Sequence, residues 1–414
     1  ARNDVKIKLT EKEITIDGTT YPKGTMIISM YQAKRSVANC ALYDGTLVDT
    51  WTVLYSEGVT TFNETRGFDM TIVAKPADFA VIDAACGAFM DYEDSLSYLS
   101  TLTSSFGGVT TGDVVISNVS ENSTAAVNAL LKSGKKVGMV TDSASAYYGD
   151  FVCSYADWLS VKDVYVLSGY GVGADTPSAN VIGQSPTIYV SGQPSTDTTG
   201  GYIKNSFVSA SYQWNYDRLA MEMMNFDMTA EPSESNLVIG STDLDEGALE
   251  EVQNGKPYLG YGIYATTGFS ELFSENMMVL SNADGMDCLG YVTYPNTSMI
   301  NASYVMDGDD VLYGYGVSYF STLPDGAIPL VQMDGSKMPT QGFIKAITDE
   351  QKAKMNAYLN DSTQAFSYVG NDKNGNAVDV TLFANSLTHK VHQQDEFAYI
   401  SNFIFSKMMT DTKY

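Results

Sequence analysis

The stretch GKPYLGYGIYATTG, residues 255–268, decides the fold that this sequence predicts. Its middle, from Pro257 on, is a short apolar run of the kind that forms a strand buried inside a sheet. Gly262 stands where the strand must turn, and Gly260 precedes it by two residues. Glycines at such a position favour a tight passage from strand to helix, which is typical of α/β proteins. This turn carries no side chain that could react.

The segment around the turn, residues 185–414, alternates regularly between predicted strands and helices. Strands are predicted at PTIYVSG, NLVIGS, PYLGYGIYA and VDVTLFA, and helices at YQWNYDRLAMEMMNF, EGALEEVQNG, TDEQKAKMNAYL and DEFAYISNFIFSKMM. In the first of these helices, the spacing predicts a buried face made of Tyr216, Leu219, Ala220, Met223 and Met224. The alternation predicts an α/β fold, a flavodoxin-like doubly wound sheet with parallel strands in its middle.

Smaller segments precede this domain. Residues 1–76 predict a β-rich segment with a hairpin at Asp17-Gly18, followed by a helix within YQAKRSVANCALY. Residues 77–184 predict an α/β domain containing a β-α-β unit, formed by DVVIS, NSTAAVNALLKSG and KKVGMVT. A loop rich in Gly, Pro, Ser and Asn then marks a boundary before residue 185. We therefore predict three domains.

Composition restricts the classes of partner. A formal charge of −25 repels nucleic acid and anionic lipid, so we expect neither as a partner. No apolar run approaches the roughly 20 residues that a membrane span needs, and the first residues lack the apolar centre of a signal peptide. We expect no membrane insertion. Abundant Tyr, Ser, Thr and Asn with few Lys predict an extracellular or cell-surface protein.

Cysteines and glycosylation sequons fit that location without requiring it. Cys40, Cys86, Cys153 and Cys288 lie far apart without metal-ligand spacing, so we interpret them as small buried residues. N-x-S/T triplets occur at Asn63, Asn118, Asn122, Asn296, Asn301 and Asn360.

Several stretches resemble a known family. Residues 21–45, YPKGTMIISMYQAKRSVANCALYDG, and residues 50–70, TWTVLYSEGVTTFNETRGFDM, are similar to the region beyond the catalytic core of long exported bacterial zinc carboxypeptidases of the carboxypeptidase A type. AAVNALLKSGKKV and GDFV look like the intermediate region of those proteins. Residues 185–414 resemble the class I glutamine amidotransferase-like domain that ends them.

The resemblance implies a peptidase centre with a zinc ion held by a His-x-x-Glu pair and a distant histidine. This sequence has two histidines, His389 and His392, and no His-x-x-Glu, so none of those catalytic residues can be assigned here. We expect the zinc cofactor only in a peptidase core upstream of Ala1, and no cofactor in this chain.

The amidotransferase resemblance also implies a lost nucleophile. Active members of that family have Gly-x-Cys-x-Gly at the strand-to-helix turn, and Gly262 occupies the cysteine position, with Gly260 before it. The partner His-x-Glu is replaced by LTHKVHQQDE, residues 387–396. We therefore predict a degenerate nucleophile turn without glutaminase activity.

Two further groups of residues have chemical potential. His389, His392, Asp395 and Glu396 could ligate a divalent metal if the segment were helical, although solvated polar residues at a helix start are the simpler interpretation. Aromatic residues that could stack on sugars or line a peptide-binding face, or else be half-buried strand residues, are Tyr212, Trp214, Tyr216, Tyr313 and Tyr315.

Three functional hypotheses follow. The leading one is a non-catalytic accessory region of an exported zinc carboxypeptidase-like protein, which packs on its own peptidase domain or binds peptide or cell-wall glycan. The second is a structural surface protein that self-assembles into a filament or layer. An enzyme with an unfamiliar site ranks last, because the sequence offers no evident nucleophile, base and metal set.

Overall fold

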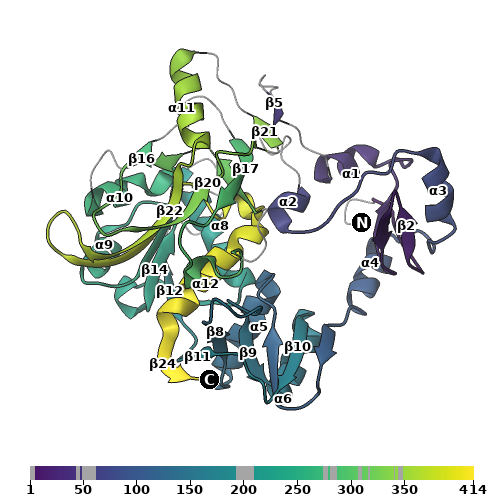
Figure 1. Ribbon diagram of the computed structural model, residues 1–414, viewed down its shortest axis with the longest axis horizontal. Helices are drawn as coiled ribbons and strands as arrows, with labels where there is room; N and C mark the ends of the chain where they lie inside the picture. Colours follow the sequence, from purple (N-terminus) through teal and green to yellow (C-terminus); the bar gives the residue numbers. More distant parts are fainter. Residues whose placement is uncertain are drawn as a thin grey trace.

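The structure is a computed structural model that describes residues 5–42, 47–48, 62–192, 209–273, 278–279, 287–305, 310–315, 318–339, 341–343 and 348–414. Its chain forms a large α/β body, a smaller sheet packed beside it, and an N-terminal unit set to one side (Figure 1). Among the helices of these residues, none is long and apolar enough to cross a membrane.

A large mixed sheet forms the centre of the first body. One half of it consists of parallel strands, in the spatial order β13 (Asp227–Thr229), β12 (Thr187–Val190), β14 (Leu237–Gly240), β15 (Tyr258–Tyr261) and β23 (Ala377–Phe383). Numbered along the chain, these strands follow the order 2-1-3-4-5. Such an order reverses direction beside the first strand, which leaves the carboxyl ends of the strands at one edge.

The other half of the sheet is antiparallel. It continues through β22 (Thr363–Asn371), β20 (Ile328–Met333) and β17 (Asp287–Thr293), and ends with β21 (Gln341–Phe343) and β5 (Leu47–Val48). The short strands β16 (Met278–Val279), β18 (Val311–Tyr315) and β19 (Tyr319–Phe320) pair beside it. The parallel strands therefore occupy one half of the sheet, not its middle as the sequence predicted.

Helices cover both faces of the parallel half. On one face lie α8 (Ser209–Met223) and α12 (Phe397–Met408), and on the other α9 (Glu246–Gln253) and α10 (Thr266–Leu272). α11 (Asp349–Leu359) precedes β22. Alternate residues along β12, β14 and β15 enter the two cores, as the two-residue period of a strand requires. This confirms the predicted mixed α/β class.

The buried face of α8 differs from the predicted one. Asp217, Ala220, Met221 and Met224 are buried, whereas Tyr216, Leu219 and Met223 are only partly covered. The buried residues follow the spacing i, i+3, i+4 and i+7, so the pattern is helical but rotated by about one residue. Ala220 and Met224 are therefore buried as predicted, whereas the apolar pattern alone did not indicate that Asp217 shares their face.

The smaller sheet contains the split form of the predicted β-α-β unit. Its order is β24 (Met409–Lys413), β11 (Ala179–Ile182), β8 (Gly138–Val140), β9 (Phe151–Ser154), β7 (Asp113–Ile116), β10 (Ser168–Gly173) and β6 (Ser105–Gly108). Strands β7 and β8 are joined by α5 (Glu121–Lys132), but β9 lies between them and is antiparallel to both. The helix α6 (Tyr155–Tyr165) leads from β9 to the strand after it.

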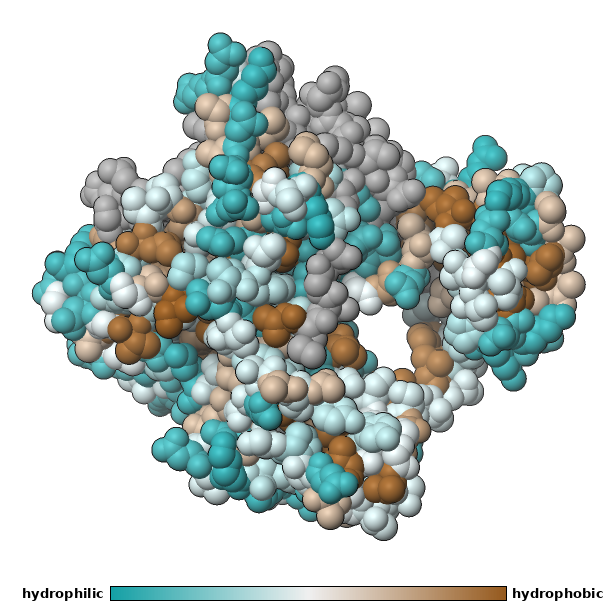
Figure 2. Space-filling model, in the orientation of Figure 1, coloured by the Kyte–Doolittle hydropathy of each residue, from teal (hydrophilic) through white to brown (hydrophobic). Residues whose placement is uncertain are grey.

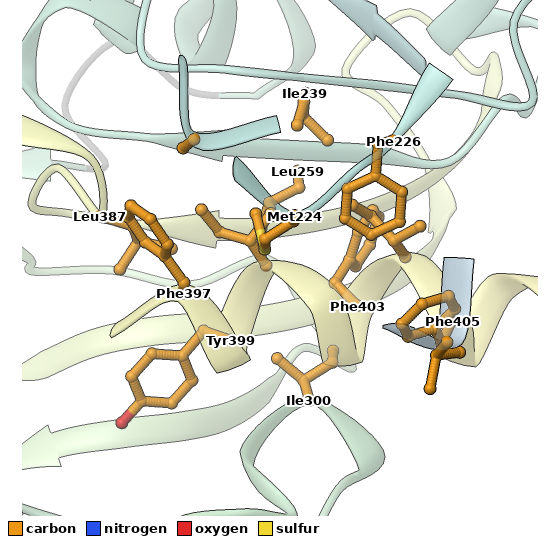
Figure 3. Packing of buried hydrophobic residues seen from close by; sticks show 14 of the residues in the cluster. Met224, Phe226, Ile239, Leu259, Ile300, Leu387, Phe397, Tyr399, Phe403 and Phe405 are labelled. Carbon is orange, nitrogen blue, oxygen red and sulfur yellow. The ribbon is translucent and has the colours of Figure 1, made fainter. Parts of the chain in front are cut away.

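Contacts in the structure cross the predicted boundary at residue 184. The last strand, β24, pairs with β11, so the chain returns from the third segment to the second. α12 also packs between the two sheets: Phe397 and Phe403 face Ile239 and Leu259, and Phe405 lies near the far end of the helix (Figure 3). One continuous core therefore joins residues on both sides of the predicted boundary at 184.

The N-terminal unit also runs beyond residue 76. It contains β1 (Ile7–Leu9), β2 (Ile14–Ile16), β3 (Thr19–Tyr21), β4 (Met26–Ile28), α1 (Arg35–Ala41), α3 (Pro76–Asp83) and α4 (Tyr92–Leu99). Ile82 and Ala85 pack on Ile14 and Ile16, so α3 belongs with the first strands. The predicted hairpin is confirmed, since Asp17 and Gly18 both have positive φ between paired strands.

The cysteines and the glycosylation sequons differ in how deeply their side chains are buried. Cys153 and Cys288 are buried, as predicted, whereas Cys86 is partly exposed; the side chain of Cys40 lies outside the described part. Asn118 and Asn301 are buried, so their amides are not accessible for glycosylation in the folded protein.

Candidate functional site

The strand-to-helix turn has the predicted geometry. β15 ends at Tyr261, and a short 3-10 helix, η3 (Ile263–Ala265), leads directly into α10. Gly262 between them has φ +87°, a left-handed conformation that side chains disfavour, and its N–H donates to the Phe383 carbonyl at 3.1 Å. The predicted strand PYLGYGIYA runs four residues beyond the observed end of β15, because the positive φ at Gly262 ends the extended conformation.

Gly260 has a packing role. A Cβ atom at this position would lie 2.5 Å from the Phe269 ring and 2.4 Å from the Tyr258 hydroxyl. The missing side chain therefore allows α10 to approach the strand that precedes it. Glycine is therefore required at residue 260 for steric reasons and at residue 262 for its backbone conformation.

The turn is closed from above by the segment that follows β23. A Cβ at residue 262 would lie 3.3 Å from Ser386 Cβ and 3.4 Å from Ser386 Cα, which is tighter than ordinary contact. Ser386 is itself buried. At this position the described residues leave little room for a side chain that could attack a substrate.

A buried carboxylate lies beside the turn, and sequence reasoning missed it. Asp217 of α8 accepts hydrogen bonds from the Ser241 N–H and hydroxyl, both at 2.8 Å, from the Tyr261 hydroxyl at 2.9 Å, and from the Thr388 hydroxyl at 2.5 Å. Burial raises the pKa of Asp217, and these hydrogen bonds oppose that rise. The sequence contained one signal for this burial: Asp217 stands at helical spacing from the apolar residues Ala220, Met221 and Met224.

The Asp217 side chain joins the carboxyl ends of neighbouring strands. Ser241 directly follows β14, Tyr261 ends β15, and Thr388 follows β23. This is the edge where open α/β sheets bind ligands. Here its polar groups bond to one another, and Asp217 has no exposed surface.

His389 directly follows Thr388 and is also buried. It begins η6 (His389–Val391), is 3% exposed, and has the Tyr216 ring at 6.1 Å and the Tyr313 ring at 6.0 Å between centroids. The structure therefore brings together three residues that the sequence assigned to two different hypotheses.

Glu396 completes this group. It ends η7 (Gln394–Glu396), and its Oε1 accepts a hydrogen bond from the Tyr313 N–H at 2.8 Å. Burial, followed by the nearby charge of Asp395, raises the pKa of Glu396 well above its usual range, whereas the Tyr313 N–H lowers it. Burial therefore favours the protonated, neutral form of this carboxyl group over the charged form.

His392 stands outside that group. Burial, followed by the positive charge of Arg66, lowers its pKa to about 4. Arg66 belongs to α2 (Phe62–Arg66), which packs against η7, and a Cβ at Gly67 would lie only 2.4 Å from Asp395 Oδ1. This contact brings the N-terminal chain against the loop after β23.

The metal hypothesis for His389, His392, Asp395 and Glu396 is not supported. Within the described residues, no group of three or more His, Cys, Asp or Glu side chains is placed to hold a metal ion. The hypothesis assumed one continuous helix. Instead the segment forms two separate 3-10 turns, with positive φ at Lys390 and Val391.

The predicted aromatic surface is only partly described. Trp214 and Tyr216 are half-buried on α8, and the Arg218 guanidinium lies 5.7 Å from the Trp214 ring. Tyr313 is 3% exposed and so cannot present its ring to a ligand. The side chains of Tyr212 and Tyr315 lie outside the described part, so for them the binding role stays a prediction.

No protein-family model matches the chain, and no curated protein matches it. Among solved structures, it is similar to a Thermoplasma acidophilum protein described as a GMP synthase subunit, with 13% identity and a TM-score of 0.30. The match covers 54% of this chain and 93% of that one.

Proposed function

We propose that this chain is a non-catalytic accessory region of an exported zinc carboxypeptidase-like protein. In this proposal residues 185–414 form a flavodoxin-like, class I glutamine amidotransferase-like domain whose nucleophile has been lost. The region packs on its peptidase domain or binds peptide or cell-wall glycan, outside the cell or at its surface. Zinc belongs to the peptidase domain.

The closed turn at Gly262 is the observation that supports this proposal most directly. A nucleophile at a strand-to-helix turn needs a side chain with space above it for a substrate carbonyl. Gly262 keeps the conformation of such a turn, but a side chain there would begin in tight contact with Ser386, 3.3 Å from its Cβ. The retained conformation supports the amidotransferase-like ancestry, and the packing supports the lost activity.

The strand order and the carboxyl edge support the same interpretation. The order 2-1-3-4-5 is the flavodoxin-like order, and ligands of such sheets bind at the carboxyl ends of the strands. In this chain that edge is occupied by the hydrogen bonds around Asp217. A domain with this interior acts through its surface.

Two activity assays and three binding assays on the purified chain test the proposal. We expect no release of C-terminal amino acids from peptides with added zinc, and no ammonia from glutamine. We also expect co-sedimentation with insoluble peptidoglycan, binding to an immobilised peptide library, or binding to the separately purified peptidase domain. Zinc-dependent turnover that a chelator abolishes would overturn the non-catalytic assignment; absence of all three kinds of binding would overturn the accessory role.

A further inference from the structure

Two helices of the N-terminal unit, with the residues just before them, carry large apolar side chains that are exposed to solvent. α4 buries none of its residues, although Tyr92, Leu96 and Leu99 recur at the spacing of one helix face. Leu99 is 54% exposed, and Phe89 just before the helix is 47% exposed. In the space-filling view, hydrophobic residues occur on the N-terminal unit and along its narrow connection to the rest of the molecule (Figure 2).

Local bonds hold α4 in helical form without that packing. Asp91 and Asp94 form a reciprocal capping box at its start. Its other side faces the N-terminal unit, where the Tyr98 hydroxyl lies 3.6 Å from the Cβ position of Gly24. The stripe that begins at Tyr92 therefore points away from the unit to which α4 belongs. We call Phe89, Tyr92, Glu93, Leu96 and Leu99 the α4 surface.

α1 and the residues before it form a second exposed surface. Tyr31 is 87% exposed, Met30 is 43% exposed and Val37 is 36% exposed. Among the α1 residues whose side chains are described, only Ala38 is buried. We call Met30, Tyr31, Lys34, Arg35 and Val37 the α1 surface.

The charges of the two surfaces are opposite. Lys34 and Arg35 are exposed and form no ion pair with any described residue, and the same holds for Glu93 between the capping residues of α4. Residues 5–42 carry six Lys or Arg and three Asp or Glu, in a chain whose formal charge is −25. Residues 5–42, which include the α1 surface, are thus basic overall, whereas residues 76–99, which include the α4 surface, carry five Asp or Glu and no Lys or Arg.

We propose that the α1 surface of one copy of this chain docks on the α4 surface of a second copy. The two surfaces lie on different parts of the N-terminal unit and belong to separate elements, so contact between them requires two molecules (Figure 1). Apolar side chains at each centre are buried by the contact, and Lys34 and Arg35 meet Glu93 at its rim. Since the surfaces differ, the contact is head to tail and leaves one surface of each kind open at the ends.

The inference is independent of the proposed function, because it requires only the surfaces of the N-terminal unit. It predicts weak, concentration-dependent association. The contact is small, and interfaces of this class bind transiently. Its charged rim predicts weaker association as salt rises.

Sedimentation velocity on the complete chain tests the proposal. At about 50 mM salt and protein concentrations from roughly 1 to 300 µM, we expect the mean mass to rise above the 44.9 kDa of one chain. Arg35→Glu and Glu93→Lys are each expected to weaken association roughly 10-fold. A mixture of the two variants, or both changes in one chain, is expected to restore it, because each altered surface regains an opposite partner.

Matched controls separate this contact from general stickiness. Leu96→Ser is expected to weaken association, whereas Val369→Ser, at a 76% exposed position on β22, is expected to leave it unchanged. Lys352→Glu on α11 is the charge control. A wild-type mass of one chain at every concentration would overturn the proposal. So would charge variants that fail to recover on mixing.

Discussion

At the scale of single residues, conformation and contact decide what the strand-to-helix turn can do. Gly262 needs a backbone angle that other residues disfavour, and a Cβ atom there would lie in tight contact with Ser386, 3.3 Å from its Cβ. Gly326 also has a φ of +90°, but no atom lies within 4 Å of its Cβ position. A substitution at Gly326 therefore tests conformational strain alone, whereas a substitution at Gly262 tests strain and steric contact together.

Substitution of alanine at these two positions gives the first prediction. Gly326→Ala is expected to lower the free energy of unfolding by roughly 1–2 kcal/mol, from the left-handed conformation alone. Gly262→Ala adds the contact with Ser386, so we expect roughly 2–4 kcal/mol. Urea unfolding followed by circular dichroism measures both. Equal losses at the two positions would show that the space above the turn is not closed.

Asp217 illustrates how one residue can organise several elements. Its carboxylate links α8 to residues at the ends of β14 and β15 and to the segment after β23. A buried carboxylate is unfavourable unless its oxygens are hydrogen-bonded, and here they accept four donors. The geometry therefore makes Asp217 a structural residue of the carboxyl edge.

At the scale of elements, α12 couples the two sheets. Phe405 is fully buried, and its ring centroid lies 5.3 Å from that of Phe151 in the smaller sheet. The Phe226 ring, just after α8, lies 5.6 Å away on the other side. The terminal helix is thus part of one core shared by both sheets.

Truncation of that ring gives the second prediction. Phe405→Ala is expected to lower the free energy of unfolding by roughly 3–5 kcal/mol, because it leaves a cavity at the junction of the sheets. Tyr170→Ala, at a 48% exposed aromatic position on β10, is the control and should cost less than about 1 kcal/mol. Hydrogen exchange should show lower protection in β9 and in β14 together. A loss confined to one sheet would contradict a shared core.

At the scale of the whole molecule, a polar junction supplements this apolar contact. Asn118, after β7, donates to Asn402 of α12 at 2.7 Å, and its N–H donates to Asp150 Oδ1 at 2.9 Å. Burial raises the pKa of Asp150 from 3.8 to about 7, although the Asn118 N–H opposes the rise. Asp150 therefore makes this junction sensitive to pH.

The sign of the third prediction follows from that raised pKa. Below about pH 4 the carboxyl group is protonated in both the folded and the unfolded chain. Between about pH 4 and 7 only the folded chain holds the proton, so the stability contributed by Asp150 falls as pH rises. Asp150→Asn should remove this dependence, and the variant should gain roughly 2–4 kcal/mol relative to wild type between pH 4 and 8. Urea titrations at both pH values measure it, with the exposed Asp411→Asn as control. A constant difference between wild type and Asp150→Asn would contradict the assignment.

The sequence alone determined the local elements. Short apolar runs and glycine stops predicted the strands at residues 187–190, 237–240 and 258–261, and the glycine turn at residue 262. These signals are local, because strand burial and positive φ leave their marks on neighbouring residues. Hence the mixed α/β class and the absence of a reactive side chain at the turn could be predicted.

Only the tertiary structure decided how those elements combine. The pairing of β24 with β11, the burial of Asp217 and the approach of Ser386 to Gly262 each join residues far apart in the chain. The sequence analysis did not single out Asp217, and it left His389 either as a metal ligand or as a solvated polar residue, because residue type and spacing describe one element at a time. Burial and hydrogen bonding depend on what packs against that element, and in this chain the partners come from distant segments.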